Sequence, residues 1–546
     1  MNFRFWNPTP SHASVLPMIQ EENEVETRSL TVCLVNEGSY PHYKGGVSTW
    51  CDMLVRGLPE VNFVLISLVA DPSARPVYEL PDNVTGLISV ALWGTSEVLE
   101  LQRDLSLAQV VRRKFSAPRK AIETQFLPLF ENFLDAIWAN ENTSPQLVET
   151  LRALATYFQL YDYDVTMRSR AVWDCFRARS VAGYQQAQDM LSPPQPIALL
   201  DVTNAMRLLY RWLTVLTIPI PQVDIVHAAA AGLCSIFGIV ASRNPRTAFL
   251  LTEHGIYQRE RLLALSRSEE SHFERVFQAR FAQRITEASY ACADKIAPGS
   301  NYNHRWEIRN GAAPQLIQTI YNGPDPQQFT PSTHNKPADA PPVIVWLGRI
   351  DPLKDLETLI RAAAIVCDVR PDVRFILYGK PPKGNEWYYQ KCLDMRERLK
   401  LQDNVIFAGF AASAAAAYTE GDFVLLTSIS EGFPYSVVEA MMCGRTVVGT
   451  DVGGVGEALE DCGLVVEPRN PADIARACLE LIWDTKRTRK LGHQAREKAL
   501  NQFSLQQCNA GYLTAYQRLV TEIRYRHPEL DFVYETAEDN QKEGHS

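Results

Sequence analysis

Two glutamates frame a short predicted helix in the second half of the chain. Glu431 lies in a loop after the apolar run Phe423–Leu426, and Glu439 follows eight positions later. Loops at the carboxyl ends of parallel strands commonly hold ligands. Because carboxylates repel phosphate but accept hydrogen bonds from vicinal hydroxyls, we interpret both glutamates as ligands of sugar hydroxyls. The alternative for each is an ordinary solvated charge; the Gly-Phe-Pro turn at 432–434 favours a site.

The stretch around these glutamates predicts a βαβ unit. Pro434 suits the first turn of a helix, because it lacks the N–H that would be unsatisfied there. Gly444 suits the position just after the helix, where the backbone turns left-handed. A second strand is predicted at 446–449.

A pair of cations follows another predicted strand, at 343–347. Arg349 and Lys354 lie five residues apart across a turn that begins with Gly348. A guanidinium and an ammonium together suit a pyrophosphate and could stabilise the charge that grows on it as it leaves. The alternative is two surface cations at a turn; the helix framed by carboxylates favours the site.

The first half of the chain offers two further candidates. Gly45 and Gly46 form a strand-to-helix turn whose N–H groups could meet a ligand, although the G-K-[ST] of a Walker loop is missing. Glu253 and His254 follow a predicted strand at 248–252. A lone histidine is usually structural, but this one enters a glycine turn followed by charged residues, which favours a site.

Composition bounds the class of protein. A length of 546 residues predicts two or more domains, and a net charge of −9 without a Lys/Arg run argues against general nucleic-acid binding. The 11 cysteines are scattered without C-x-x-C pairs, which favours a reducing cytoplasm. No signal peptide is expected, because Glu21, Glu22, Glu24 and Glu26 lie within the first thirty residues, where an apolar segment would be needed. The apolar stretch 225–242 is predicted to be a strand and a buried helix rather than a membrane span.

Two series of α/β alternation predict two Rossmann-like domains. The strands of the first are expected at 30–35, 63–68, 223–227, 248–252 and 295–297, and those of the second at 343–347, 373–378, 404–408, 422–427 and 446–449. The predicted boundaries are a flexible arm at 1–28, a first domain at 29–320 with a helical insertion at about 96–216, a second domain at 321–504, a C-terminal helix at 505–530 and a disordered tail at 531–546.

Several of these motifs together resemble the GT-B glycosyltransferases of family 4. They are the G-R-x-x-x-x-K turn at 348–354, the E-x(7)-E pair, the Asn-Gly-x-Asp entry at 322–325, and Phe329. The segments 37–41, 45–48, 250–257 and 426–432 resemble the PelF family, cytosolic glycosyltransferases of Pel exopolysaccharide synthesis. The resemblance covers about residues 30–525. The segments 379–383 and 433–436 depart from the PelF pattern.

The resemblance implies an α/β protein of GT-B fold, in which the two domains face a cleft and the C-terminal helix crosses back to the first domain. It further implies a metal-independent, anomer-retaining transfer from a nucleotide sugar, expected to be a UDP-sugar, with no cofactor. It assigns catalytic roles to Arg349, Lys354, His254 and Glu431, and substrate binding to Gly45, Gly46, Glu253, Gly348, Gly409, Phe410, Gly432, Phe433, Pro434 and Glu439.

Within that set the expected roles differ. Arg349 and Lys354 hold the diphosphate, Glu439 binds the ribose, and Glu431 with the amides of Gly432 and Phe433 grips the donor sugar. Gly46 approaches the phosphate, His254 faces the sugar, and the loop at 409–410 meets the base.

The expected partners are a UDP-sugar, a glycan acceptor and an inner-membrane polysaccharide synthase complex, with no nucleic acid. The expected location is the cytoplasm, at the periphery of the inner membrane. Two alternatives stay open: a non-catalytic nucleotide-sugar-binding subunit of a membrane polysaccharide synthase, and another GT-B enzyme such as a UDP-sugar epimerase or a phosphorylase.

Overall fold

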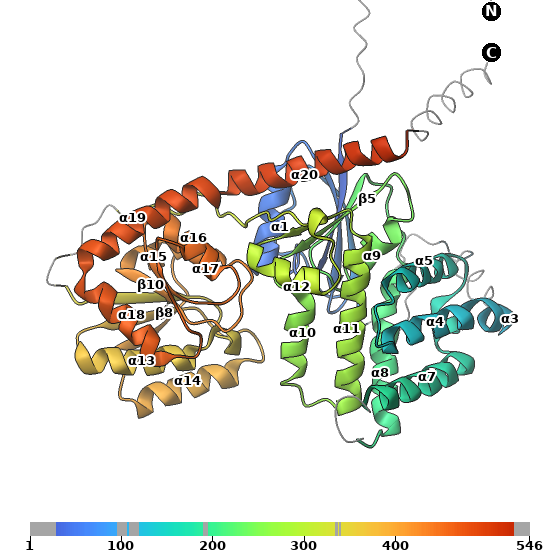
Figure 1. Cartoon of the computed structure of the whole chain (residues 1–546), viewed down its shortest axis with the longest axis horizontal. Helices are drawn as coiled ribbons and strands as arrows, with labels where there is room; N and C mark the ends of the chain where they lie inside the picture. Colours follow the sequence, from blue (N-terminus) through green and yellow to red (C-terminus); the bar gives the residue numbers. More distant parts are fainter. Residues whose placement is uncertain are drawn as a thin grey trace, which may run out of the picture.

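The computed structural model describes residues 29–94, 106, 108, 119–188, 195–332, 337 and 340–528. The predicted arm at 1–28, the predicted tail at 531–546 and most of the first part of the insertion lie outside these residues. The described chain forms two α/β lobes, each built on a parallel six-stranded sheet (Figure 1). This is the predicted architecture.

The first sheet has the strand order β3-β2-β1-β4-β5-β6. Its strands are β1 (Thr31–Glu37), β2 (Asn62–Val69), β3 (Val84–Ala91), β4 (Ile225–Ala228), β5 (Ala248–Glu253) and β6 (Lys295–Pro298). The edge strand β3 was not predicted from the sequence. Its first six residues are only partly buried or exposed and include Gly86, so the apolar run typical of a central strand is absent.

The second sheet repeats this topology with the order β9-β8-β7-β10-β11-β12. Its strands are β7 (Val343–Leu347), β8 (Arg374–Tyr378), β9 (Val405–Gly409), β10 (Phe423–Leu426), β11 (Val447–Thr450) and β12 (Leu464–Val466). The unpredicted strand β12 has three residues and lies at an edge. In both sheets the strand order reverses between two central strands, β1 and β4 in one and β7 and β10 in the other. Ligands of open α/β sheets bind beyond the carboxyl ends of such strands.

The regular structure of the expected insertion is helical throughout its described part. It comprises α3 (Arg119–Ala121), the π-helix η2 (Ile122–Phe126), α4 (Leu127–Trp138), α5 (Ser144–Leu160), α6 (Tyr163–Met167), α7 (Arg170–Gln188), α8 (Leu199–Trp212) and the 3-10 helix η3 (Leu213–Thr217). These helices pack beside α11 (His272–Cys292), and their aromatic side chains join the core of the first lobe.

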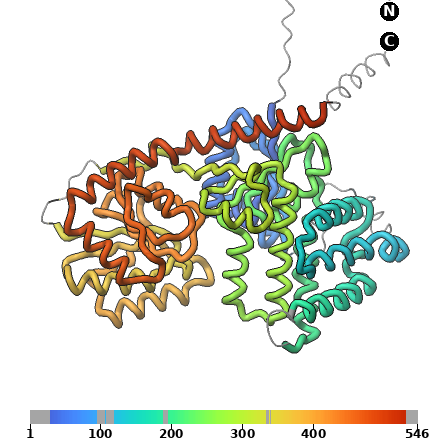
Figure 2. The backbone as a smooth tube through the Cα atoms, viewed as in Figure 1, coloured from blue at the N-terminus to red at the C-terminus, as the bar shows by residue number. Residues whose placement is uncertain are grey.

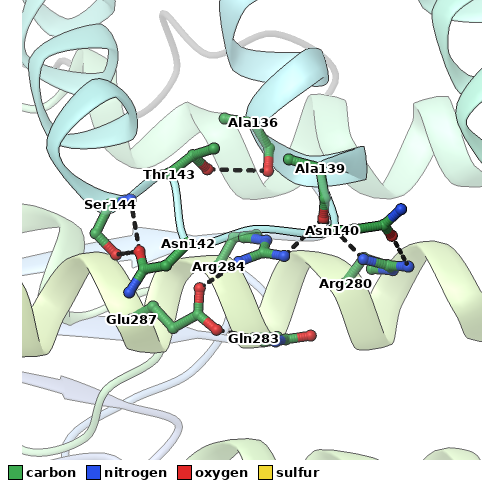
Figure 3. A network of polar contacts seen from close by, with 10 residues as sticks. All are labelled: Ala136, Ala139, Asn140, Asn142, Thr143, Ser144, Arg280, Gln283, Arg284 and Glu287. Atoms are coloured by element: carbon green, nitrogen blue, oxygen red, sulfur yellow. Dashed lines mark hydrogen bonds and ion pairs between the residues drawn. The ribbon is translucent and has the colours of Figure 1, made fainter. Parts of the chain in front are cut away.

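A buried arginine fixes the insertion to α11. Arg284 is 2% exposed; it pairs with Glu287 at 2.5 Å and donates to the carbonyl oxygen of Ala139 at 2.6 Å (Figure 3). Arg280 donates to the same carbonyl at 2.8 Å. Ala139 follows the last residue of α4, so two cations satisfy the carbonyl end of that helix, where the helix dipole favours positive charge.

The remaining helices cover the sheets. In the first lobe they are α1 (Gly46–Gly57), α9 (Ser235–Ala241), α10 (Tyr257–Leu265), η4 (Asn301–Asn303), α12 (His304–Arg309) and η5 (Pro314–Leu316). In the second they are η6 (Pro352–Lys354), α13 (Leu356–Val369), α14 (Glu386–Arg398), α15 (Ala414–Glu420), α16 (Tyr435–Met442), α17 (Val455–Leu459), α18 (Pro471–Trp483) and α19 (Thr485–Gln502). The apolar stretch 225–242 is the strand β4 and the helix α9, and no described helix is long and apolar enough to cross a bilayer.

The last helix, α20 (Leu505–Arg526), runs from the second lobe along the first (Figure 2). It packs against α1, β4 and β5. Its Tyr516 hydroxyl lies 2.7 Å from His227 Nδ1, and the Tyr512 hydroxyl lies 3.2 Å from Thr252 Oγ1, all within the buried core. These polar contacts fix the register of α20 on the first sheet.

Candidate functional site

The centre of the candidate site is an ion pair between the two loops at the switch point of the second sheet. Lys354, after β7, places Nζ 2.5 Å from Oε1 of Glu431, after β10. The side chains keep 21% and 10% of their surface exposed. The charges are therefore paired but reachable by a ligand.

Backbone contacts hold Lys354 in place. The Ile429 N–H donates to the carbonyl of Leu353 at 2.8 Å, and the Thr427 hydroxyl donates to the carbonyl of Lys354 at 2.9 Å. Asp355 follows in the left-handed region with φ 48° and caps α13 through Thr358. The rigid turn aims the lysine across the switch point, as a positioned cation requires.

Arg349 is the second predicted cation of this loop. It is exposed and makes no ion pair within the described residues. The pKa of Glu260 on α10 is raised, chiefly by burial and also by the charge of Glu431; the charges of Arg259 and Arg349 oppose this rise. Glu260 belongs to the first lobe, so α10 brings a third carboxylate to the site. No sequence signal distinguishes it from its charged neighbours.

The two lobes touch at Gly432. A Cβ at this position would lie 1.6 Å from the carbonyl oxygen of His254, so only glycine fits. Gly454 N–H donates to the Gly432 carbonyl at 2.6 Å, and Arg259 donates to the Ser430 hydroxyl at 3.2 Å. The loop that carries Glu431 is thus held directly against the end of β5.

His254 keeps an unsatisfied imidazole nitrogen. Its Nε2 is buried and has no hydrogen-bond partner within the described chain, and its ring stands edge-on to Trp50 with centroids 4.4 Å apart. Burial lowers the pKa of His254 to about 4, so the ring is neutral near pH 7. A neutral imidazole with an unpaired nitrogen can bond a hydroxyl that reaches it, and it carries no charge to attract the diphosphate.

Glu253 is a correction to the sequence prediction. The residue is fully buried, and its two oxygens accept the N–H groups of Ala231 at 2.9 Å and Tyr257 at 3.0 Å. Because the Glu253 carboxyl group is fully buried and already accepts hydrogen bonds from two amides, it is not placed to contact a substrate. Glu253 instead joins the loops that follow β4 and β5.

Glu439 lies on α16, partly buried. Its Oε2 accepts the Tyr418 hydroxyl at 2.8 Å, and burial raises its pKa to about 7. Gly444 ends this helix as predicted, with φ 71°. The Gly444 N–H donates to the carbonyl oxygen of Met441, and the Arg445 N–H donates to that of Ala440. Pro434 is the residue before the helix rather than its first residue.

Phe433 contributes only its backbone to the site. Its ring is 3% exposed and packs between Tyr321 and Phe503, at centroid distances of 4.9 and 5.0 Å. Pro434 is buried as well. These side chains anchor the loop, which leaves the backbone amides of Gly432 and Phe433 as the groups that a ligand could meet.

The remaining predicted residues lie on separate loops. Gly45 precedes α1, and a Cβ added to it or to Gly46 would have no neighbouring atom within 4 Å, so their backbone is accessible. Gly348 donates to the Tyr378 carbonyl at 3.0 Å. Gly409 turns with φ 72°, after which Phe410 is 74% exposed, with Lys380 Nζ 4.8 Å from its ring centre.

The structure therefore joins four predicted residues by contact: Lys354, Glu431, Gly432 and His254. Arg349 follows β7 in the same loop as Lys354, without a contact to these four residues among the interactions of the described chain. No group of three or more His, Cys, Asp or Glu side chains in the described part of the chain is arranged to hold a metal. Two cations and a carboxylate at the switch point of the second sheet, with an unpaired imidazole nitrogen after β5 of the first, suit a ligand with both phosphates and hydroxyls.

Comparison with known proteins identifies the class. The fold is that of GT-B glycosyltransferases: the structure matches Anabaena HepE in complex with UDP with a TM-score of 0.54 at 15% identity, covering 90% of this chain and 100% of that one. Sucrose-phosphate synthase from Thermosynechococcus elongatus matches with a TM-score of 0.56 at 17% identity, over 90% and 100% of the two chains.

Residues 30–315 match the family described as "Domain of unknown function (DUF3492)", and residues 341–484 match "Glycosyl transferases group 1". The chain belongs to the DUF3492 family, and its second domain is similar to the group 1 glycosyl transferases.

Two curated relatives are similar to part of the chain. N-acetyl-alpha-D-glucosaminyl L-malate synthase of Bacillus anthracis is 28% identical over 37% of this chain and 53% of its own length. D-inositol 3-phosphate glycosyltransferase of Rhodococcus opacus is 28% identical over 41% of this chain and 52% of its own length. The chain thus spans about half the length of these relatives.

Proposed function

We propose that this protein is a glycosyltransferase that moves a sugar from a UDP-sugar to a glycan acceptor, of the PelF kind that builds an exopolysaccharide. The observation that carries the proposal is the Lys354–Glu431 pair at the switch point, beside the exposed Arg349. Two cations at this place match a diphosphate, and the carboxylate beside them matches sugar hydroxyls.

In the proposed mechanism the donor diphosphate takes the place of Glu431 as the partner of Lys354. Arg349 binds the same group, and both cations stabilise the negative charge as the bond to the sugar breaks. Glu431 is then free to accept hydrogen bonds from the sugar. The ion pair of the unliganded protein keeps both groups oriented before the donor arrives.

His254 is proposed to bond a hydroxyl of the transferred sugar through its open nitrogen. Its carbonyl already touches Gly432, so this contact would tie the first lobe to the sugar that the second lobe holds. We further propose that the acceptor attacks from the face that the diphosphate leaves, which retains the anomeric configuration, and that no metal ion takes part. Both proposals rest on the family 4 resemblance.

The names of similar proteins support sugar transfer from a nucleotide donor. The Rhodococcus opacus relative is a glycosyltransferase by name, and structures of Anabaena HepE hold UDP and UDP-glucose. Membership of a Pel system rests on the four short segments that resemble PelF.

A second candidate function is that of a nucleotide-sugar-binding subunit in a membrane synthase. It is favoured by the exposed apolar residues of the insertion, among them Leu199 at 66% and Leu200 at 65%, at the start of α8. Such a subunit would bind the nucleotide without turnover.

The test is nucleotide release by the purified protein over a panel of UDP-, GDP- and ADP-sugars, with and without EDTA. We expect release from one UDP-sugar, unchanged by EDTA, and reduced about 10²–10³-fold in Lys354→Ala. Lys486→Ala, which removes an exposed lysine on α19, is the matched control. Full activity of Lys354→Ala would overturn the site. UDP binding without release from any donor would favour the non-catalytic role.

A further inference from the structure

Three arginines surround one tryptophan beside the candidate site. The guanidinium carbons of Arg259, Arg305 and Arg309 lie 5.9, 6.0 and 5.8 Å from the ring centre of Trp306. Arg305 also lies 4.0 Å above the ring of Tyr302. We name these five residues the arginine–tryptophan cluster. Figure 1 shows α10 and α12, which carry most of it, on the side of the first lobe that faces the second.

The cluster is continuous with the donor site. Arg259 donates to the hydroxyl of Ser430, which immediately precedes Glu431. The backbone N–H groups of Asn301 and Tyr302 donate to the carboxylate of Glu457 on α17, so the start of this segment is fixed against the second lobe. A ligand on the cluster would therefore lie near the sugar held by Glu431.

The positive charge of the cluster is neutralised only in part: burial raises the pKa of Glu260, and the neighbouring charge of Arg259 lowers it. Arg259, Arg305 and Arg309 make no ion pair with a described carboxylate, and Arg305 and Arg309 are exposed one helical turn apart, where like charges repel. Two other carboxylates nearby are used or shielded. Glu457 accepts two amides and the Tyr321 hydroxyl at 3.1 Å, and Glu307, a residue of α12, is fully buried.

The aromatic rings orient these cations. A guanidinium stacked on a ring has its plane fixed and its N–H edge directed outward, ready for a planar anion. The indole N–H of Trp306 is buried and has no hydrogen-bond partner within the described chain, so an additional donor lies at the same place. A protein of net charge −9 thus concentrates several unused donors next to its reaction centre.

We propose that the arginine–tryptophan cluster binds an anionic group of the acceptor, either a carboxylate of an acidic glycan or the phosphate of a lipid-linked one. This inference rests on the proposed transferase function and names the class of its second substrate. The carboxylate or phosphate accepts hydrogen bonds from the guanidinium N–H groups of Arg305 and Arg309. Arg259 connects this anion site to the loop that carries Glu431. A neutral glycan would leave these donors unsatisfied.

The test measures binding of two anionic probes to the full-length protein saturated with UDP, by quenching of tryptophan fluorescence and by calorimetry. The probes are trigalacturonate, which carries carboxylates, and farnesyl phosphate, which carries a phosphate on a lipid; maltotriose is the neutral comparison. The variant is the double substitution Arg305→Gln with Arg309→Gln. The control, Arg361→Gln with Arg518→Gln, removes the same charge from exposed arginines of α13 and α20.

We expect one anionic probe to bind the cluster variant at least tenfold more weakly than the unsubstituted protein, and to bind the control variant with unchanged affinity. Its binding to the unsubstituted protein should weaken as the salt concentration rises. The probe that responds identifies the source of the anion. Equal binding of both probes to the cluster variant and the control, or no binding of either probe to the unsubstituted protein, would overturn the proposal.

UDP affinity is measured in parallel, so that failure of the proposed transferase function can be distinguished from failure of the proposed acceptor site. If the unsubstituted protein did not bind UDP, the proposed function itself would be contradicted. Unchanged UDP binding in the cluster variant, with loss of the anionic probe, isolates the acceptor side.

Discussion

The two sheets have the same strand order, yet a carboxylate at each switch point has a different kind of partner. Glu37, at the end of β1, accepts the backbone N–H of Cys234 at 2.8 Å, and a Cβ on Gly232 would lie 2.5 Å from the same oxygen. Glu431, after β10, is paired with the ammonium of Lys354. A backbone amide cannot leave, whereas a lysine can exchange one anion for another. One topology thus supports a closed structural junction in the first lobe and an exchangeable site in the second.

Gly432→Ala tests whether the second switch point depends on contact with the first lobe, and should have the largest effect. The added carbon would displace the His254 carbonyl or the Glu431 loop, so we expect turnover to fall by about two orders of magnitude or more, as small misplacements of reacting groups do. The measurement is the initial rate of nucleotide release. Gly86→Ala, where a Cβ meets only Val64 at an ordinary 3.5 Å, is the control. Activity equal to that of Gly86→Ala would mean that the lobes need not touch here.

Glu37→Ala and Glu431→Ala separate the two kinds of carboxylate. Glu37→Ala leaves a buried amide unsatisfied and should lower the free energy of unfolding by about 1–3 kcal/mol. Glu431→Ala removes a partly exposed ion pair and should cost about 1 kcal/mol or less, while it reduces turnover strongly. Urea denaturation measures the free energy of unfolding of each variant, and nucleotide release measures its turnover. If both variants lost mainly stability, the proposed distinction between the sites would be wrong.

If Glu439 binds the donor ribose, as the family resemblance implies, donor affinity should depend on pH. Because burial raises its pKa to about 7 from 4.5, the protonated form predominates below pH 7, and Glu439 makes folding less favourable as the pH rises from about 4.5 to 7. A carboxylate that accepts ribose hydroxyls must lose that proton. Affinity for UDP-glucose, whose diphosphate does not titrate in this range, should therefore drop up to about tenfold per pH unit below 7.

Calorimetric titration of UDP-glucose from pH 5.5 to 8.5 checks this dependence. Glu439→Gln should bind more weakly at pH 8 and show a flat profile. A steep profile that persists in Glu439→Gln would assign the titration to another group.

Phe410→Ala should have the smallest effect. The exposed ring follows β9 at the edge of the second sheet, and we expect it to stack on the base of the donor. Loss of one stacking contact should raise KM a fewfold, by about 1 kcal/mol, without changing kcat. Trp387→Ala, which removes another exposed aromatic residue of the same lobe, serves as the control. A lowered kcat would mean that Phe410 acts nearer the reacting bond.

Most of the fold could be predicted from local pattern. The central strands of both sheets are short apolar runs with sharp boundaries, and α20 has long helical periodicity that begins with a capping box at Ser504. The edge strands β3 and β12 could not be predicted in this way. Edge strands bury less surface, so their sequences carry less of the apolar signal that marks a central strand.

The sequence by itself determined the charged and glycine residues of the site, because a turn between strand and helix needs particular residue types. It could not decide which of these residues share a surface. Glu253 and His254 are neighbours, yet the first accepts hydrogen bonds from two amides, whereas the buried Nε2 of the second has no partner within the described chain. Arg259 and Trp306 are far apart in the chain and meet only because β5 and β6 are adjacent strands. Contacts of this kind depend on how the sheets and lobes pack, and only the tertiary structure decides them.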